Sequence, residues 1–104
     1  NEFLACPIIY NDNTGRHEWF VEFKKEPLDI QKFINLLDEE LKNINSDYEC
    51  KRFNDLILKN PIIRLMPKNF FYNSMKRKGK VGGQNKIPRL QNNRKFIDEL
   101  IPYL

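Results

Sequence analysis

The chain has 104 residues, of which 18 are Lys or Arg and 14 are Asp or Glu, so its formal net charge is +4. This length fits one domain with a single modest core, and a hydrophobic content of 40% excludes a disordered tail. No apolar run approaches the ~20 residues that a membrane-spanning helix requires. The chain begins with Asn1, not Met, and enters a strand-like run directly, so we expect a piece of a longer protein.

The two cysteines predict neither a disulfide framework nor a metal site. Cys6 and Cys50 stand far apart, and neither belongs to a C-x-x-C pair. A single histidine leaves too few ligands for zinc. We therefore expect free thiols in a reducing compartment, and a cytoplasmic protein.

The first part of the chain predicts an antiparallel hairpin. Residues 3–10 are mostly apolar, and Pro7 within them indicates a sheet edge, because proline cannot donate to the ladder. Residues 11–15 have turn composition. Residues 17–23 alternate and predict a strand with one buried face. That face would carry His17, Trp19, Val21 and Phe23, and the solvent face Glu18, Phe20 and Glu22.

Two helices are predicted next. Pro27 suits a first helical turn, and apolar residues then recur at three- and four-residue spacing. This inward stripe consists of Ile30, Phe33, Ile34, Leu37, Leu41 and Ile44, and the solvated face of Gln31, Lys32, Asp38, Glu39 and Lys42. The run 45–47 ends this helix and caps a second, shorter one over 47–53.

The last third predicts a strand and two helices. The strand covers 62–66, and Asn69 would cap a helix to residue 78 with Phe71, Met75 and Phe70 inward. A basic loop, 79–92, follows. Asn92 or Asn93 would cap the final helix, whose stripe is Phe96, Ile97, Leu100 and Ile101. The order β-β-α-α-β-α-loop-α predicts a small α+β domain: a mostly antiparallel three-stranded sheet packed with three to four helices.

A basic segment holds the candidate site. Residues 68–95 contain nine Lys or Arg and no acid, so they carry +9 and the rest of the chain −5. The loop 82–89 within them carries Gly82, Gly83, Gln84, Lys86 and Arg89. One interpretation is that Lys86, with Arg89, meets a phosphate or carboxylate while the glycines allow close approach and hinge motion. The other is a solvated loop with incidental charge. The spacing is not that of a Walker A loop.

The remaining candidates favour structural roles. We expect the acids 38–40 to face water on their helix, and charges within 47–52 to form local pairs worth a few tenths of a kcal/mol. His17 fits a satisfied or partly exposed strand histidine better than a base. No serine or cysteine nucleophile has a recognisable context. The chain therefore shows no complete active site of its own.

Aromatic residues interleaved with the basic segment raise the question of nucleic-acid binding. Phe70, Phe71, Tyr72 and Phe96 could stack on RNA bases. Helical spacing instead places Phe71 and Phe96 in the core, and no known nucleic-acid-binding motif is visible. The alternative function is a stand-alone basic module that binds nucleic acid or an acidic protein. A third possibility is oligomerisation through the edge strand that contains Pro7.

Several stretches together carry a family resemblance. They run in the family's order over nearly the whole chain: 17–24, 37–41, 45–52, 67–71, 78–80 and 82–89. The last, glutamine-x-lysine-x-proline-arginine after a glycine, is the most specific. The chain resembles the C-terminal domain of the auxin-responsive Gretchen Hagen 3-type acyl acid amido synthetases, in their bacterial form. Asn69-Phe70 departs from the family's usual glycine-threonine, which alters a helix cap.

The resemblance implies a function for residues 1–104 as a mobile C-terminal lid domain. Such enzymes belong to the acyl-adenylate-forming superfamily: they use ATP and Mg²⁺ to convert a carboxylic acid to acyl-AMP, then transfer the acyl group to an amino acid. A large N-terminal adenylation domain holds the nucleotide and the acyl pocket. Lys86 matches the lysine that reaches the carboxylate and α-phosphate, and Gln84 and Arg89 would hold the loop's shape. The isolated domain should bind no cofactor and should not catalyse.

Overall fold

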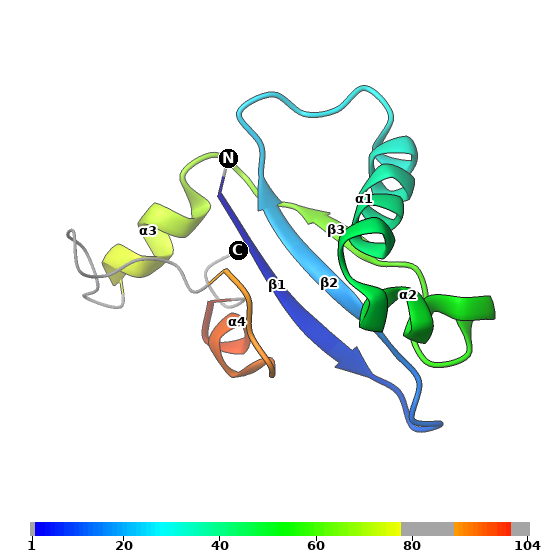
Figure 1. The fold of residues 1–104 in the computed structure, drawn as a ribbon. Coiled ribbons are helices and arrows are strands. Elements are labelled where there is room, and N and C mark those ends of the chain that lie inside the picture. Colours follow the sequence, from blue (N-terminus) through cyan, green and yellow to red (C-terminus); the bar gives the residue numbers. More distant parts are fainter. Residues whose placement is uncertain (1, 78–88, 101–104) are drawn as a thin grey trace.

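The structure, a computed structural model, describes residues 2–77 and 89–100. Its centre is a three-stranded sheet in the order β1-β2-β3, formed by Glu2–Ile9, Gly15–Glu22 and Ile62–Leu65 (Figure 1). β1 and β2 form the predicted antiparallel hairpin, which pairs Glu2 with Glu22 at one end. β1 lies at the edge of the sheet, as Pro7 predicted.

Two helices connect β2 to β3, so these strands run in the same direction. α1 covers Ile30–Ile44, α2 covers Ser46–Arg52, and a short 3-10 turn, η1, covers Phe53–Asp55. β3 pairs with β2 in parallel, as expected for a crossover through helices. The α+β class, the three strands and the element order are confirmed, and the sheet is mixed.

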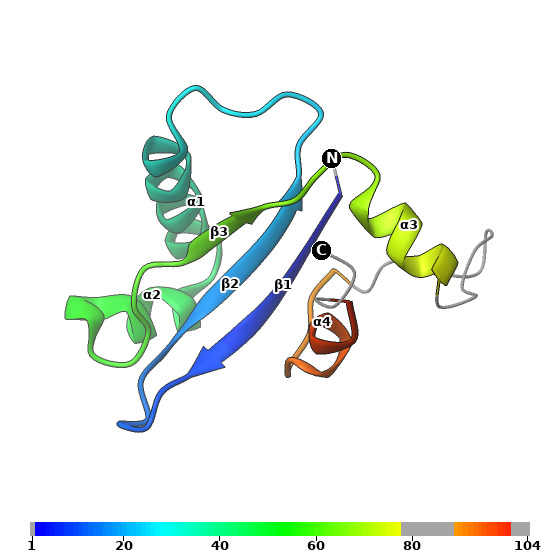
Figure 2. The ribbon, with the colours of Figure 1, turned by 180° about the vertical axis from the view of Figure 1, so that it is seen from behind.

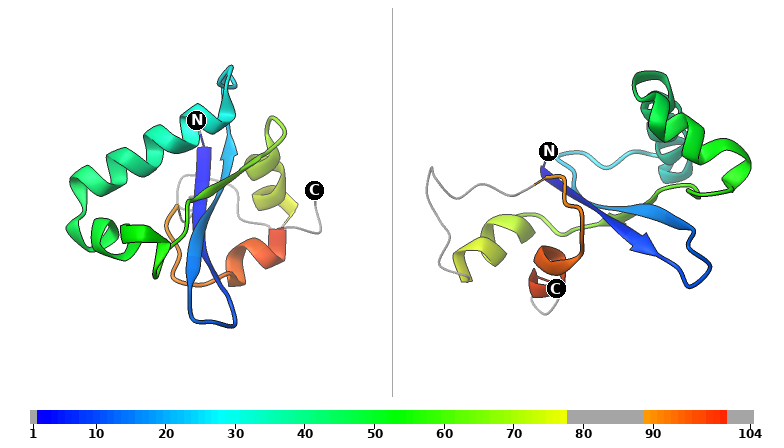
Figure 3. Two further views of the ribbon diagram at one scale, coloured as in Figure 1. Left: turned by 90° about the vertical axis from the view of Figure 1, so that its right-hand side faces the viewer. Right: turned by 60° about the horizontal axis from the view of Figure 1, so that its bottom comes forward.

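Helices cover both faces of the sheet. α3 (Phe70–Arg77) and α4 (Lys95–Leu100) lie on the face opposite to α1 and α2 (Figures 2 and 3). The prediction that β2 has one buried face is therefore wrong. Glu18 and Phe20, on its predicted solvent face, are buried beneath α3 and α4, and Val21 is buried as well. Alternation of apolar and polar residues in a strand predicts a solvent-exposed face only if no helix packs on that face.

The core lies between the sheet and the second helix pair. Its buried members are Leu4, Cys6, Phe20, Phe70, Phe71, Ile97 and Leu100, with Met66 and Phe96 packed against them. The inward positions predicted for α3 are confirmed, since Phe70, Phe71 and Met75 are all buried. In α4, Ile97 and Leu100 are buried as predicted, while Ile101 lies outside the described residues. Each fully buried side chain of this kind contributes about 1.5–3 kcal/mol to folding.

α1 is the amphipathic helix that the sequence predicts, with differences at its two ends and at Asp38, which is buried. Its N-cap is Asp29, whose carboxylate accepts the Lys32 N–H at 3.1 Å, so Pro27 lies before the helix and not in its first turn. Ile44, predicted inward, is 76% exposed at the C-terminal end of the helix. Phe33 packs edge-on against Phe23, with ring centroids 5.2 Å apart, and this contact fixes α1 on the sheet.

Candidate functional site

The predicted site is described only at the far end of its loop. Gly82, Gly83, Gln84 and Lys86 lie outside the described residues, so their assignments stay predictions. Arg89 is described, and its side chain is exposed. The structure therefore shows how the basic loop is attached where it returns to the domain.

The stretch 89–91 is attached to the outer edge of β1. The Ala5 N–H donates to the Arg89 carbonyl oxygen at 2.7 Å, and the Gln91 N–H donates to the Ala5 carbonyl oxygen at 3.0 Å. The two bonds form a parallel bridge between Ala5 and Leu90. We call residues 89–91 the edge clamp. It fixes the C-terminal end of the loop that was predicted to carry the site.

The same edge is closed to further pairing a little beyond the edge clamp. Pro7, two residues after Ala5, has no N–H, and its carbonyl oxygen lies 3.4 Å from Nη1 of Arg94, which donates to it. A strand edge interrupted by a residue without an N–H is a poorer template for another strand. This arrangement disfavours oligomerisation through the strand that contains Pro7.

The side chain of Arg89 lies along the beginning of β1. Its guanidinium carbon is 5.3 Å from the ring centroid of Phe3, and Nη2 is 3.8 Å from Oε1 of Glu2. A cation–π contact at an exposed site is worth about 0.5–1 kcal/mol. These contacts fit a residue that holds the shape of the loop, because the guanidinium is already engaged by its own domain.

A buried carboxylate anchors the chain between the edge clamp and α4. Glu18 is 4% exposed, and its two oxygens each lie 2.8 Å from an arginine: Oε1 from Arg94 Nη1 and Oε2 from Arg64 Nε. Burial opposes the charge of Arg94, but the Glu18 carboxylate outweighs this effect and raises the arginine's pKa. The sequence analysis placed Glu18 on the solvent face and did not predict its burial. Its position between His17 and Trp19 in a strand was the feature that could have indicated it.

The N-terminus of α3, which precedes the loop, is held by Glu22 of β2. Its Oε2 accepts the Asn69 N–H at 2.9 Å and its Oε1 accepts the Phe71 N–H at 3.2 Å. Asn69 itself has φ 63°, and its backbone N–H is one of the groups that Glu22 satisfies. Asn69 directly precedes α3, and its carbonyl oxygen accepts the Asn73 N–H at 2.9 Å, so it occupies the predicted cap position. The side chain that accepts the exposed amides is the Glu22 carboxylate, 47 residues away in the sequence.

Beside Glu22 lies an open hollow of about 380 Å³. Two bases and two acids contribute to its wall, and the full lining is Glu2, Glu22, Phe23, Lys24, Lys68 and Asn69. Glu2 also faces Arg89, so the hollow and the edge clamp share one end of the sheet. The described residues at this end offer charge for binding.

Asp38 and Arg52 form a second buried pair, on the α1 and α2 face. Arg52 Nε lies 2.7 Å from Asp38 Oδ1 and Nη2 lies 2.8 Å from Oδ2, while the Tyr48 hydroxyl donates to Oδ1 at 2.6 Å. Burial raises the pKa of Asp38, but the hydrogen bonds from Arg52 and Tyr48 dominate and lower it to about 2. The prediction that Asp38 faces water is wrong, because α2 folds back over α1 and covers it.

The other charges of α2 behave as the sequence predicts. Lys51 Nζ is 3.0 Å from Asp47 Oδ2, a surface pair one helical turn apart. Asn45 caps the helix, accepting the Tyr48 N–H at 3.0 Å. Arg52 is the exception to the predicted local pairing, since it reaches across to α1.

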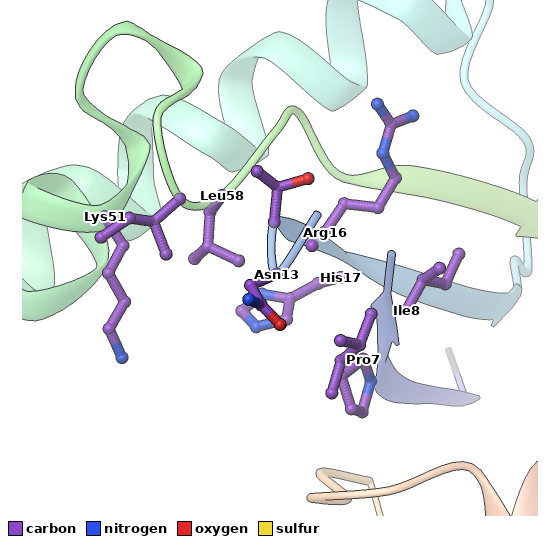
Figure 4. A pocket seen from close by; sticks show the side chains of 11 residues that line it. Pro7, Ile8, Asn13, Arg16, His17, Lys51 and Leu58 are labelled. Carbon is purple, nitrogen blue, oxygen red and sulfur yellow. The ribbon is translucent and has the colours of Figure 1, made fainter. Parts of the chain in front are cut away.

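His17 lines a shallow hollow of about 240 Å³ at the other end of the sheet (Figure 4). Its ring stacks on Tyr48 with centroids 5.8 Å apart. Burial lowers the pKa of the imidazole, which is then neutral at pH 7. The prediction of a partly exposed strand histidine is confirmed.

Other chemistry is sparse in the part of the chain that the structure describes. Cys6 is buried and Cys50 exposed, and both thiols are free. Residues 2–77 and 89–100 contain no group of three His, Cys, Asp or Glu side chains that could hold a metal ion. Within those residues, no helix is long and apolar enough to cross a membrane.

Fold and site together define a small α+β domain with a mixed sheet between two helix pairs and a basic loop that returns to the edge of that sheet. This chain belongs to the GH3 family: residues 1–95 match the GH3 family C-terminal domain. No curated protein sequence matches the chain.

A solved structure described as "GH3.15 acyl acid amido synthetase" has a similar fold. The TM-score is 0.61 at 17% sequence identity, and the match covers 97% of this chain. The match covers only 19% of that synthetase's chain. The likeness therefore confirms the architecture. The chain spans about a fifth of the length of that synthetase.

Proposed function

We propose that this domain is the C-terminal lid of an ATP-dependent acyl acid amido synthetase, which forms an acyl-AMP and passes the acyl group to the amine of an amino acid. The observation that carries the proposal is the match of residues 1–95 to the GH3 family C-terminal domain. The coverage of 19% of a solved synthetase supports a larger N-terminal partner in the same polypeptide. The free thiols agree with a cytoplasmic protein.

In the proposed first half-reaction, an oxygen of the acid's carboxylate attacks the α-phosphorus of ATP and pyrophosphate leaves. Negative charge accumulates on the oxygens of the pentacoordinate phosphorus. We assign Lys86 to offset that charge from the lid side, where water is excluded and a point charge is worth most. In the second half-reaction the amine attacks the acyl carbon and AMP leaves, a step that needs no lysine at the phosphate.

One contact among the described residues supports the role proposed for Lys86. Arg89 follows Lys86 by three positions, and its backbone is bonded to β1, so an ordered point of attachment lies close in sequence to the proposed catalytic lysine. The proposal places the ATP and Mg²⁺ sites in the N-terminal domain, and no step assigned to this chain uses the metal.

The test is Lys86→Ala in the full-length protein. We expect acid-dependent exchange of pyrophosphate into ATP to fall by about 10²–10³, the usual effect of removing one transition-state charge. Transfer from preformed acyl-AMP should change by less than about threefold. Lys95→Ala, an exposed base on α4, is the matched control. Equal losses in both half-reactions would contradict the role of Lys86.

The alternative, a basic module for nucleic acid or an acidic protein, has weaker support. Two of its nine bases are engaged inside the domain, Arg89 with Phe3 and Arg94 with Glu18. The core also contains Phe70 and Phe71, which are buried and not available for base stacking. Steeply salt-dependent, submicromolar binding of RNA by the full-length protein would favour this alternative.

A further inference from the structure

The turn that follows α2 presents large apolar side chains to solvent. Phe53 is 66% exposed, Leu56 68% and Ile57 51%. We call these three residues the apolar turn. Ile9 at the end of β1 adds a fourth exposed apolar side chain, and the Gly15 N–H bonds to the Ile57 carbonyl oxygen at 2.9 Å, which joins the turn to the hairpin. Exposed apolar residues that gather at one place mark an interaction surface more often than scattered ones do.

The backbone of the apolar turn has a left-handed conformation at two consecutive residues. Asn54 and Asp55 have positive φ, 52° and 56°. Asn and Asp are the residues other than glycine that adopt this conformation most readily, so the local sequence favours the turn.

Arg52 holds the apolar turn in place through hydrogen bonds from its buried side chain. Its buried guanidinium pairs with Asp38 on α1, and the same group donates to Asp55 and to the Leu58 carbonyl oxygen, the latter at 2.9 Å. The apolar turn is thus fixed to the body of the domain at both ends. Because it is ordered before binding, a partner that docks there does not have to order it.

A concave feature lies next to the turn. The shallow hollow of Figure 4 is lined by residues of the hairpin and of the turn, among them Pro7, Ile9, Ile57 and Leu58. An apolar side chain of a partner could enter this hollow while Phe53 and Leu56 pack beside it. Such a pairing of anchor and pocket is typical of the centre of an interface.

The area of the apolar turn decides what kind of partner it fits. Three side chains exposed to this degree offer roughly 300 Å², well below the ~800 Å² per partner of a stable interface between separate proteins. A partner in the same polypeptide needs less area, because the connection supplies an effective concentration of about millimolar. A second copy of the chain, which would have to associate from dilute solution, fits poorly.

We propose that the apolar turn, with the adjoining hollow, is a docking surface for the N-terminal part of the full-length protein. This inference rests on the proposed function, which supplies that partner. The turn is bonded to Gly15, which pairs with Ile9 at the end of β1, whereas Arg89 is bonded to Ala5, four residues earlier and roughly 14 Å away along the strand. The docking surface is therefore separate from the edge clamp.

Site-specific photo-crosslinking in the full-length protein tests the docking surface. A benzophenone amino acid replaces Leu56 in one variant and Leu36 in another, which is 57% exposed on α1 and serves as the matched control. Mass spectrometry then identifies the crosslinked peptides. We expect position 56 to crosslink to peptides of the same molecule outside residues 1–104, at a yield about fivefold or more above that of position 36.

Mixing isotope-labelled and unlabelled protein separates the possible results. Crosslinks from position 56 between labelled and unlabelled copies would overturn the proposal in favour of a dimer. Equal yields at positions 56 and 36, or products confined to residues 1–104, would also overturn it. The Lys86→Ala assay reports on the proposed function by a different measurement, so either claim can fail while the other stands.

A charged side chain gives a second test in the same protein. Leu56→Asp should slow at least one half-reaction by about tenfold, because a buried apolar anchor typically contributes at least that much to docking. Leu36→Asp should leave both half-reactions unchanged. A melting temperature of Leu56→Asp within the range of Leu36→Asp confirms that the domain still folds. Unchanged rates with Leu56→Asp would overturn the proposal.

Discussion

Glu18 and Arg94 lie 76 residues apart in the sequence, and their charged groups meet at 2.8 Å. The pair joins the central strand to the stretch that links the edge clamp with α4. Arg94 also donates to the Pro7 carbonyl oxygen. One arginine thus fixes the return of the basic loop on two strands at once.

Glu18→Gln should lower the free energy of unfolding by about 3 kcal/mol, because it leaves two arginines without their buried counter-charge. The matched control is Arg64→Ala, whose side chain is 57% exposed and whose removal should cost less than 1 kcal/mol. Urea denaturation of both variants measures the difference. Equal losses would mean that Glu18 acts as a surface residue.

Arg52→Ala should be among the most damaging single substitutions outside the apolar core. It leaves the Asp38 carboxylate buried without its partner and releases the turn after α2, so we expect a loss of about 3–5 kcal/mol in the free energy of unfolding. Lys51→Ala, which removes only the surface pair with Asp47, should cost at most about 0.5 kcal/mol. Chemical denaturation of both variants measures their free energies of unfolding. Similar losses in the two variants would contradict the prediction that the buried pair matters more than the surface pair.

Asp38 should make the protein sensitive to acid. Its pKa falls from an ordinary 3.8 to about 2 on folding, so the ionised carboxylate favours the folded state above pH 4, and this stabilisation is lost as the pH falls from about 4 to 2. The contribution is about 2 kcal/mol. Thermal melts between pH 2 and 6 should show a steeper fall for the wild-type protein than for Asp38→Asn, which lacks the titrating group. Parallel curves would exclude this linkage.

Glu22→Ala should loosen the beginning of α3 without unfolding the domain. Removing a carboxylate cap costs about 1–2 kcal/mol. Amide hydrogen exchange is the informative measurement, because the Asn69 and Phe71 amides lose their acceptor and should exchange faster. The amide of Ala5, bonded to the edge clamp, is an internal control that should not change. Uniform acceleration across the domain would indicate global destabilisation instead.

Arg89→Ala should separate stability from activity, on the proposed function. Its exposed contacts with Phe3 and Glu2 contribute less than about 1 kcal/mol to folding. If Arg89 holds the loop that bears Lys86, pyrophosphate exchange in the full-length protein should still slow by about tenfold. Arg89→Ala added to Lys86→Ala should have no further effect on exchange. Additive losses would show that the two residues act independently.

Much of the fold was predictable because local patterns determine it. The turn at 11–15, the apolar stripe of α1 up to Leu41 and the cap at Asn45 each act within a few residues, and each is confirmed, while Ile44 at the end of the stripe is exposed. The acid-free basic segment and the motif after Gly83 pointed to the family from the sequence. The basic loop's own geometry lies outside the described residues, so Lys86 stays a prediction.

The tertiary structure decided which charges are buried and what they hold. Asp38, Glu18 and Glu22 look like solvent-facing acids in their own helix or strand. Each is drawn inward by a partner far along the chain: Arg52, Arg94 and the amides of α3. A buried carboxylate is stable only with such a partner, and no local pattern specifies one at that distance. The periodicity of apolar residues therefore determined the helices and strands. Ion pairs and hydrogen bonds between residues distant in sequence determined how the end of the basic loop is attached.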